Sequence, residues 1–360
     1  MIAPPRSVLV VVTRRIGDVL LATPLIRSIK QGWPDTKIDV LVFDGTQGIL
    51  AGNPDIREVR VVAERPEWLS HLGFLARLWR RYDVALSLLA GDRPTLYAWI
   101  AGRWRAGTLV DAANQRWKQH LLSRWVAFDD LNTHTVRMHL ALTRELGIAP
   151  LGEVNVSWRP EDAQSVERAL AGNARPLAVL HAYPKFNYKM WRPDAWIAVA
   201  QWLDQRGFRI VLSGGADAVE QEYVGTLARQ MPSGTINVAG KLSLGGSGCL
   251  ASRASLYVGT DTAMTHIAAA AGVPTVALFG PSNPVKWGPW PKGQPVDVNP
   301  WRRCGSQRAG NVALLQGAEP CVPCLLEGCE RNTASFSDCL QRLPPKNVIA
   351  AIEAVTAQRY

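Results

Sequence analysis

Residues 257–284 read YVGTDTAMTHIAAAAGVPTVALFGPSNP, and this stretch decides the fold that we expect. A short apolar run ends at Gly259 and a polar turn follows. The alanine-rich residues 262–271 predict a helix, which a glycine and a proline end. Residues 275–279 are apolar without alternation, as in a parallel strand covered on both faces. The stretch therefore predicts a strand–helix–strand unit of an α/β sheet.

The polar turn of this unit is a candidate binding site. Thr260 or Asp261 can cap the helix, whose free N–H groups and positive dipole end suit a phosphate or pyrophosphate. The Gly-Pro-Ser-Asn-Pro loop at 280–284 follows the next strand, at the edge where open α/β sheets bind ligands. The alternative is an ordinary strand–helix–strand unit whose loop binds nothing.

Length and composition indicate a soluble protein of two domains. A chain of 360 residues suits two domains of about 150 residues each. Hydrophobic residues make up 47% and charged residues 19%, the proportions of an ordinary globular protein, and no apolar run reaches about 18 residues. The first apolar run precedes its basic pair, the reverse of a secretory signal, so we expect a cytoplasmic protein.

The charge balance favours anionic partners. A net charge of +10 suits a nucleotide, a phosphorylated lipid, nucleic acid or an acidic membrane surface. Several of the 14 tryptophans lie beside arginines, and such pairs can anchor at lipid headgroups or stack on sugars. Amphipathic helices with solvated arginines explain any single pair equally well. Because the basic residues are scattered and no nucleic-acid-binding motif occurs, we expect no nucleic-acid partner.

Strand patterns alternate with helical patterns along the chain, which predicts right-handed parallel α/β sheets. The expected strands are residues 8–13, 37–43, 59–62 and 83–89, then 177–181, 209–213, 236–238, 256–258 and 275–279. The expected helices are residues 19–31, 68–81, 95–101, 133–146, 161–171, 193–205 and 218–230. Residues 111–130, which are polar and rich in Trp, Arg and Lys, are expected to form an acceptor-side loop.

A charged segment that contains glycine and proline predicts the boundary between two α/β domains. We expect an N-terminal domain of residues 1–160 and a C-terminal domain of residues 161–345 that includes a cysteine-rich segment at 304–339. Residues 346–360 are expected to form an amphipathic helix that packs back on a domain. Two parallel sheets facing a central cleft would provide a natural site for an enzyme with two substrates.

The first strand is followed by Arg14, Arg15, Ile16, Gly17 and Asp18. Gly17 permits a tight turn from strand to helix, and Asp18 falls at the helix N-terminus, a favourable place for a carboxylate. Asp18 is therefore a candidate functional carboxylate, and the alternative is that it only caps the helix.

Two lysines follow the first strand of the second half. Lys185 and Lys189 could reach a phosphate at the strand ends, since lysine is a competent point-charge ligand for phosphate. Neither the dinucleotide-binding glycine fingerprint nor the P-loop motif occurs in the sequence. A nucleotide would therefore have to be held by loops and by a helix start.

A glycine pair follows the next strand. Gly214 and Gly215, after Ser213, allow close approach of the backbone to a ligand. Glu220 or Glu222 just beyond could hydrogen-bond a ribose, and the one not used would be a solvated helix carboxylate. These residues are candidates for binding the donor nucleoside.

Three stretches together resemble glycosyltransferase family nine, the heptosyltransferases of the lipopolysaccharide inner core. They are RRIGDVLLATPLIRSIKQGWPDTKIDVLV, the KMW loop at 189–191, and VGTDTAMTHIAAAAGVPTVALFGPSNPVKWGPW, in the family's order over nearly the whole chain. The resemblance implies a GT-B fold of two Rossmann-like domains, with the nucleotide sugar on the C-terminal domain and the acceptor on the N-terminal one. It implies transfer of heptose from ADP-L-glycero-β-D-manno-heptose, with inversion and with neither a metal nor another cofactor.

The same resemblance implies the partners of the enzyme. The acceptor would be a phosphorylated, Kdo-bearing lipid A-core at the inner leaflet of the cytoplasmic membrane of a Gram-negative bacterium. The enzyme would bind that membrane peripherally. Transfer to the first, the second or a branching third heptose position is compatible with the motifs.

The resemblance also assigns roles to residues. Asp18 matches the proposed general base, and Lys189 matches a lysine that contacts phosphate. The motif that holds pyrophosphate and heptose is matched by Asp261, Thr262, Ala263, Met264 and His266. Relatives more often have glycine in place of Ala263. Arg14, Arg15 and Arg93 would meet the anionic acceptor, although each could equally be a solvated surface residue.

The chemistry of inverting transfer fits these roles. Inversion needs a base that takes the acceptor hydroxyl's proton on the face opposite the leaving nucleotide. The leaving ADP needs fixed positive charge, which a helix N-terminus and Lys189 can supply. Two other hypotheses remain at this point. One is a GT-B enzyme that uses a UDP-hexose or UDP-N-acetylhexosamine, either as a transferase for envelope polysaccharide or as an epimerase. The other is a non-enzymatic basic protein.

Five of the six cysteines crowd the segment 304–339, and Cys249 stands apart from it. The spacing C-x2-C-x4-C-x9-C of the last four could ligate Zn²⁺ or an iron–sulfur cluster, or the four could be plain thiols. Permanent disulfides are not expected in a reducing cytoplasm. The residues concerned are Cys304, Cys321, Cys324, Cys329 and Cys339. Catalysis as proposed requires no metal there.

Overall fold

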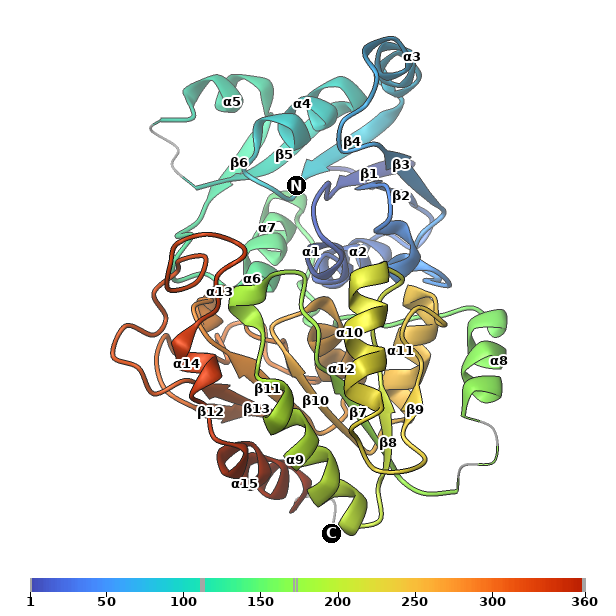
Figure 1. Ribbon diagram of the computed structural model, residues 1–360. Helices are drawn as coiled ribbons and strands as arrows, with labels where there is room; N and C mark the ends of the chain where they lie inside the picture. The colour runs from blue at the N-terminus through green and yellow to red at the C-terminus, as the bar shows by residue number, and fades with distance from the viewer. Residues whose placement is uncertain (1, 111–113, 171, 173, 358–360) are drawn as a thin grey trace. The chain divides into compact units, whose positions relative to one another are not determined.

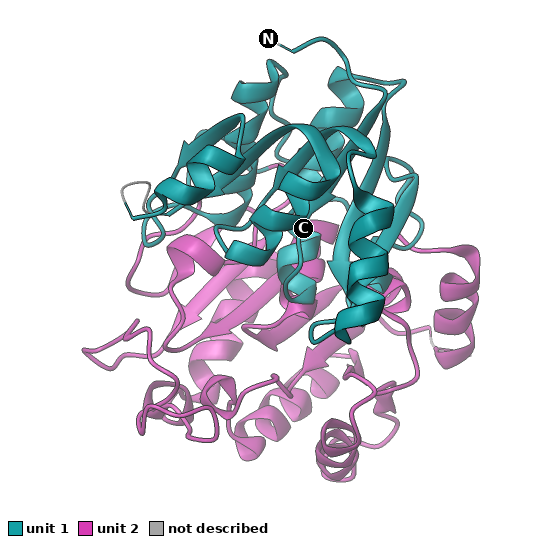
Figure 2. Cartoon of the chain, turned by 90° about the horizontal axis from the view of Figure 1, so that it is seen from above, with its two compact units in different colours: residues 1–155, 294–299 teal, residues 156–293, 300–360 magenta. Residues whose placement is uncertain are grey.

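The computed structural model describes residues 2–110, 114–170, 172 and 174–357. The chain forms two compact units (Figure 2). Unit 1 is Met1–Asn155 with Gln294–Asn299, and unit 2 is Val156–Gly293 with Pro300–Tyr360. The division after Asn155 lies close to the boundary predicted at residue 160. The assignment of the short segment Gln294–Asn299 to unit 1 was not predicted.

Unit 1 is a six-stranded parallel sheet with the order β3-β2-β1-β4-β5-β6 (Figure 1). Its strands are β1 (Ser7–Val11), β2 (Lys37–Phe43), β3 (Glu58–Val62), β4 (Tyr82–Ser87), β5 (Gly102–Leu109) and β6 (Arg124–Ala127). Its helices are α1 (Ile16–Leu20), α2 (Thr23–Gly32), η1 (Gln47–Leu50), α3 (Trp68–Leu78), α4 (Asp92–Ala101), α5 (Arg116–Leu121), α6 (Thr135–Leu140) and α7 (Leu142–Leu146). β1 is rich in valine and almost fully buried, as its central place in the sheet requires.

Unit 2 is a seven-stranded sheet with the order β12-β13-β11-β10-β7-β8-β9, parallel except for β12. Its strands are β7 (Leu177–His181), β8 (Arg209–Leu212), β9 (Ile236–Asn237), β10 (Leu256–Thr260), β11 (Thr275–Phe279), β12 (Gln307–Ala309) and β13 (Val312–Gln316). Its helices are α8 (Pro160–Ala169), η2 (Asn187–Lys189), α9 (Pro193–Gln205), α10 (Ala218–Ala228), α11 (Leu244–Arg253), α12 (Ala263–Ala271), α13 (Pro284–Trp287), α14 (Asp338–Gln341) and α15 (Pro345–Thr356). α15 packs on α9, β11 and β13, so the last helix of the chain belongs to unit 2 (Figure 1).

Each sheet has one point where the strand order reverses. In unit 1 the first strand, β1, lies between β2 and β4, and in unit 2 the first strand, β7, lies between β8 and β10. Loops that leave the carboxyl ends of the strands on either side of such a point diverge and open a crevice that binds ligands in α/β proteins. The reversal therefore selects the loops after β1 and β4 in unit 1, and those after β7 and β10 in unit 2.

The predicted loop at 111–130 is wrong over half of its length. Residues 111–113 lie outside the described residues, but α5 and the edge strand β6 form within the rest. β6 has only four residues, too few for an alternating pattern to be recognised, and its neighbour β5 was not predicted either. β5 opens with Gly102, where a Cβ atom would lie 2.6 Å from the Cβ of Ala85. A glycine that reads as a loop residue is thus required for close strand packing.

The single helix predicted at 19–31 is two helices, α1 and α2. Pro24 lies in the first turn of α2, where its ring is incompatible with a continuous helix from α1. The carbonyl of Leu20 instead accepts a hydrogen bond of 2.7 Å from the Thr23 hydroxyl. α11, α13, α14 and β12 were not predicted, because each is short or rich in glycine and polar residues. β13 was missed as well, although VALLQ is an apolar run of the same length as β1.

None of the helices in the described part of the chain is long and apolar enough to cross a membrane.

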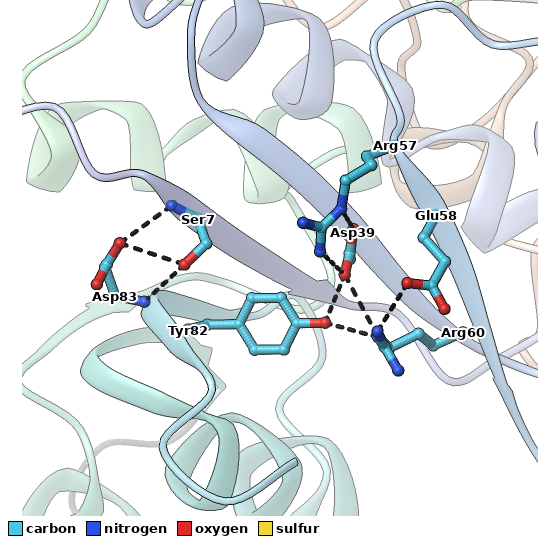
Figure 3. A network of polar contacts seen from close by, with 7 residues as sticks. All are labelled: Ser7, Asp39, Arg57, Glu58, Arg60, Tyr82 and Asp83. Carbon is cyan, nitrogen blue, oxygen red and sulfur yellow. Dashed lines mark hydrogen bonds and ion pairs between the residues drawn. The ribbon is translucent and has the colours of Figure 1, made fainter. Parts of the chain in front are cut away.

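A buried polar network ties β2, β3 and β4 of unit 1 together (Figure 3). Asp39 on β2 is fully buried and accepts hydrogen bonds from Arg57 Nε at 2.8 Å and from the Tyr82 hydroxyl at 2.6 Å. Arg60 Nε lies 3.3 Å from the same carboxylate, and its Nη2 pairs with Glu58 at 2.7 Å. Since β1 lies between β2 and β4, Tyr82 reaches across β1 to Asp39. The network therefore fixes the order of three strands.

Removing Asp39 should destabilise unit 1 strongly. We expect Asp39→Ala to lower the free energy of unfolding by about 3–5 kcal/mol, because the buried Tyr82 hydroxyl and the largely buried Arg60 lose their shared acceptor. Glu58→Ala removes a pair whose acid is 48% exposed, so it should cost at most about 1 kcal/mol. Urea denaturation measures both, and equal costs for the two variants would contradict the role given to Asp39.

Candidate active site

Two loops of unit 2 meet at the reversal point between β7 and β10. Lys189, at the end of the loop after β7, places its Nζ 2.6 Å from Oδ2 of Asp261, which directly follows β10. The same carboxylate oxygen accepts a hydrogen bond of 2.6 Å from Ser282, in the loop after β11. Asp261 is 8% exposed and Lys189 is 17% exposed, so this is a largely buried ion pair. The pair ties together the three loops that surround the expected ligand position.

Of the two titratable side chains after β10, the structure keeps Asp261 charged and His266 neutral. Burial alone would raise the pKa of Asp261, but the ammonium group of Lys189 and its hydrogen bond outweigh burial and leave that pKa below its usual value. Burial lowers the pKa of His266 to about 4. At neutral pH, Asp261 is therefore a carboxylate and His266 is a neutral imidazole.

The start of α12 has no side-chain cap. Its N-cap is Thr262, one or two residues later than predicted, and no side chain hydrogen-bonds the cap position. The Asp261 side chain does not cap the helix, because Lys189 and Ser282 bind it. The first N–H groups of α12 have no partner within the helix, and they carry the positive end of its dipole. Nδ1 of the buried His266 also has no hydrogen-bond partner among the described residues.

The predicted donor-nucleoside residues lie in the loop after β8. The Ser213 hydroxyl is 3.0 Å from Nδ1 of His181, at the end of β7, so it links two neighbouring strand ends. The Gly215 N–H donates a hydrogen bond of 2.6 Å to Oε1 of Glu220. A Cβ atom on Gly214 would lie 3.0 Å from the same oxygen. Glu220 thus closes the loop on itself, and its contact with a ribose stays a prediction.

In unit 1, Asp18 lies at the equivalent reversal point. It follows β1, within α1, and only 6% of it is exposed. Nε of Arg14 lies 3.7 Å from its Oδ2, and the Arg14 side chain is 48% exposed. Arg15 is exposed as well. A shielded carboxylate flanked by accessible arginines suits a group that handles a proton beside an anionic substrate.

Arg93, on the other side of this reversal point, donates hydrogen bonds to other residues of unit 1. Its Nη2 donates to the Ala63 carbonyl at 2.8 Å, and its Nη1 donates to the carbonyl of Glu64. Its Nε donates to the Tyr97 hydroxyl at 2.8 Å, and the guanidinium stacks 5.1 Å from the ring centre of Phe43. Arg93 therefore positions the loop after β3, and a direct contact with an acceptor stays a prediction.

Comparison with known proteins places the chain in a family. Residues 77–309, more than half of the chain, match the profile of glycosyltransferase family 9 (heptosyltransferase). The chain belongs to this heptosyltransferase family. It is 31% identical over 296 residues to lipopolysaccharide heptosyltransferase 3 of Escherichia coli, an alignment that covers 76% of this chain and 83% of that protein.

Solved structures confirm the fold of this heptosyltransferase. A family 9 glycosyl transferase from Veillonella parvula has a TM-score of 0.78 at 20% identity, covering 98% of this chain and 97% of that one. The E. coli ADP-heptose LPS heptosyltransferase II has a TM-score of 0.75 at 20% identity, covering 98% and 99%. The predicted α/β class and GT-B architecture of two Rossmann-like domains are thus confirmed.

Two residues that bind predicted site residues of unit 2 were not themselves predicted. Ser282 binds Asp261, and His181 binds Ser213. Ser282 lies in the loop at 280–284 that was singled out as a ligand loop, so its position at a strand end was a usable signal. His181 ends a strand and gave no signal of its own.

The Lys189–Asp261 pair should control the stability of unit 2 in a pH-dependent way. The depressed pKa of Asp261 means that its contribution is present above the usual carboxyl pKa of about 4 and is lost as pH falls through the folded value. In Lys189→Met the buried Asp261 carboxylate has no partner charge. The free energy of unfolding should therefore fall by about 3–5 kcal/mol at pH 7, and by less toward pH 4, where Asp261 takes up a proton.

Thermal or urea denaturation across pH 4–8 measures this difference. Lys185→Met, on the exposed lysine of the same loop, is the matched control and should be neutral at every pH. Adding Asp261→Asn to Lys189→Met should recover most of the loss. A cost that is independent of pH would show that the two charges do not stabilise one another.

Proposed function

We propose that this heptosyltransferase moves L-glycero-D-manno-heptose from ADP-L-glycero-D-manno-heptose to the inner core of lipopolysaccharide. Inversion at the anomeric carbon and a reaction centre without a metal ion are part of the proposal. The observation that carries it is the Lys189–Asp261 pair at the uncapped start of α12. The names of the relatives support the substrates, since they describe lipopolysaccharide heptosyltransferases and an ADP-heptose enzyme.

The donor diphosphate would lie over the first turn of α12. N–H groups of Ala263 and Met264 would bind its oxygens, as helix starts bind phosphate elsewhere. Lys189 would supply a fixed positive charge for the leaving ADP, and Asp261 holds that lysine in place. The neutral His266 can donate or accept one hydrogen bond through its unpartnered Nδ1, which suits a sugar hydroxyl or a phosphate oxygen.

Asp18 would act as the general base. The acceptor hydroxyl attacks the anomeric carbon as its proton passes to the Asp18 carboxylate, and the bond from that carbon to the ADP oxygen breaks. ADP leaves as an anion, so inversion results from a single displacement. Arg14 and Arg15 are accessible beside Asp18 and suit the phosphates of the acceptor.

Replacing the base should affect turnover and leave donor binding unchanged. We expect Asp18→Asn to lower kcat by about 10²–10⁴-fold, while the affinity for ADP stays within about twofold. ADP release from ADP-heptose with a deacylated core acceptor measures the rate, and calorimetry measures ADP affinity. The exposed Asp129→Asn is the control.

Two results would overturn this function. Turnover by Asp18→Asn at the wild-type rate would show that Asp18 is not the general base. A thermal shift with UDP-glucose or UDP-N-acetylglucosamine, and none with ADP-heptose, would replace the donor with that of the alternative sugar transferase.

We also propose that the enzyme is cytoplasmic and docks peripherally on an anionic membrane through α3. The inner face of α3 packs Phe74, Leu75 and Leu78 against the core of unit 1. Its outer face is apolar too, with Trp68, Leu69 and Leu72 each more than half exposed. A soluble helix rarely presents apolar residues on both faces unless something covers the outer one.

The charges around α3 suit a lipid surface that is negative. Arg65, Arg77, Arg80 and Arg81 are exposed on or beside the helix. The guanidinium of Arg80 lies 5.7 Å from the ring centre of the half-exposed Trp79, an arrangement suited to the headgroup region. Each such basic residue contributes about 1 kcal/mol near an anionic bilayer. Docking through this surface would bring the enzyme to the membrane that holds its lipid-anchored acceptor.

Vesicle binding tests the α3 surface. Trp68→Ser with Leu72→Ser should weaken binding to vesicles that contain phosphatidylglycerol by about tenfold or more, because both side chains lose their burial in the interface. Val219→Ser, at a residue 61% exposed on α10, should bind as the wild type does. Cosedimentation measures both, and equal binding of the double variant and the control would refute this docking surface.

A further inference from the structure

The cysteine-rich loop at 317–337 is long and lacks a core of its own. It connects β13 to α14 without a helix or strand, and loops of more than about 12–15 residues with no such element are uncommon in compact domains. Few of its residues are buried, and Leu325, Leu326 and Phe336 are all about half exposed. Apolar contacts alone are thus too few to fix the conformation of this loop. Its backbone is nonetheless tightly specified, since Leu325 and Arg331 both have positive φ angles.

Cys339 and the residue after Cys324 each contact one of two adjacent residues that follow β11. A Cβ atom on Gly280 would lie 3.2 Å from Sγ of Cys339, which is buried in α14. The N–H of Leu325, the residue after Cys324, donates a hydrogen bond of 2.9 Å to the carbonyl of Pro281. Because Gly280 and Pro281 are adjacent, Cys324 and Cys339 are brought to one place from opposite ends of the loop.

The other two cysteines belong to the same cluster. Sγ of Cys329 accepts a hydrogen bond of 3.4 Å from the backbone N–H of Asp338, the residue before Cys339. Backbone N–H groups directed at sulfur are typical of thiolate ligands, because they stabilise the negative charge. Cys321 lies three residues before Cys324, the spacing at which one turn offers two sulfurs to one ion.

We propose that Cys321, Cys324, Cys329 and Cys339 hold one thiophilic metal ion of the Zn²⁺ class, which fixes the loop at 317–337 to the carboxyl edge of the unit 2 sheet. The pattern of four thiolates with a C-x2-C start is the ligand set that zinc favours. Cys249 and Cys304 are not part of the site.

The sulfurs of Cys324, Cys321 and Cys329 all lie close enough to the Cys339 thiol to interact with it. A bound cation would deprotonate its thiol ligands. Among the described residues, no three His, Cys, Asp or Glu side chains are already gathered closely enough to hold an ion. Binding would therefore draw the four sulfurs together and release their protons.

The site would act on the donor loop through direct hydrogen bonds. The Ser337 hydroxyl donates to the Tyr188 carbonyl at 2.7 Å, and the Asn187 amide donates to the carbonyl of Ala334 at 2.9 Å. Gln341, in α14, donates to the Met190 carbonyl at 2.8 Å. These contacts hold the backbone on both sides of Lys189. The metal would thus be a positioning element for the proposed phosphate lysine and would take no part in bond making.

Elemental analysis of the full chain, purified under reducing conditions with zinc supplied, tests the site. We expect about one zinc or iron ion per chain in the wild type, in Cys249→Ser and in Cys304→Ser. Cys324→Ser and Cys339→Ser should lose it. Because these variants could fail to fold, the native wild type is also titrated with a thiol reagent. Four of its six thiols should react only after a chelator is added, as metal is released.

Several outcomes would overturn the site. They are a wild type without metal, metal content unchanged in Cys324→Ser, or four thiols found as two disulfides under the same conditions. The functional consequence rests on the proposed donor site: chelation should raise the KM for ADP-heptose severalfold and change kcat less. Metal content and thiol protection do not depend on heptose transfer, so a wrong substrate assignment leaves the test of the metal site intact.

Discussion

The buried ion pair between Lys189 and Asp261 is the interaction on which the loops at the β7–β10 reversal point of unit 2 depend. A carboxylate that is 8% exposed needs a partner charge, and the lysine supplies it from a loop more than seventy residues earlier in the chain. Lys189 and Ser282 bind the Asp261 side chain, and the N-cap residue Thr262 makes no side-chain cap hydrogen bond. A lysine is thus fixed at the residue that precedes the uncapped start of α12.

The two sheets explain why the chemistry gathers where it does. In each unit the first strand sits in the interior of the sheet, and the chain winds outward from it in both directions. Asp18 follows the first strand of unit 1, and Lys189 follows the first strand of unit 2. The same topological rule therefore selects one functional loop in each half. The membership of this chain in the heptosyltransferase family agrees with that placement.

Much of the fold could be predicted from the sequence, because interior parallel strands are continuous apolar runs. β1, β2, β7, β10 and β11 were all located in this way. The edge strand β6, the glycine-led β5 and the glycine-rich helix α11 were missed, since their residues look polar or flexible until a neighbour is present. The predicted site residues Asp18, Ser213 and Asp261 do lie after strand ends, and their roles stay predictions. The contact of Ser282 with Asp261 and the engagement of Arg93 with backbone carbonyls depend on tertiary packing that no local pattern encodes.

A crystal structure of the protein with ADP bound tests the central claim most directly. The account predicts the β-phosphate over the first turn of α12, within hydrogen-bond distance of a backbone N–H at Ala263 or Met264 and of the Lys189 ammonium. Asp261 should keep its contact with the lysine in that complex. A nucleotide bound elsewhere on unit 2, or a diphosphate that leaves this helix start bare, would contradict the account.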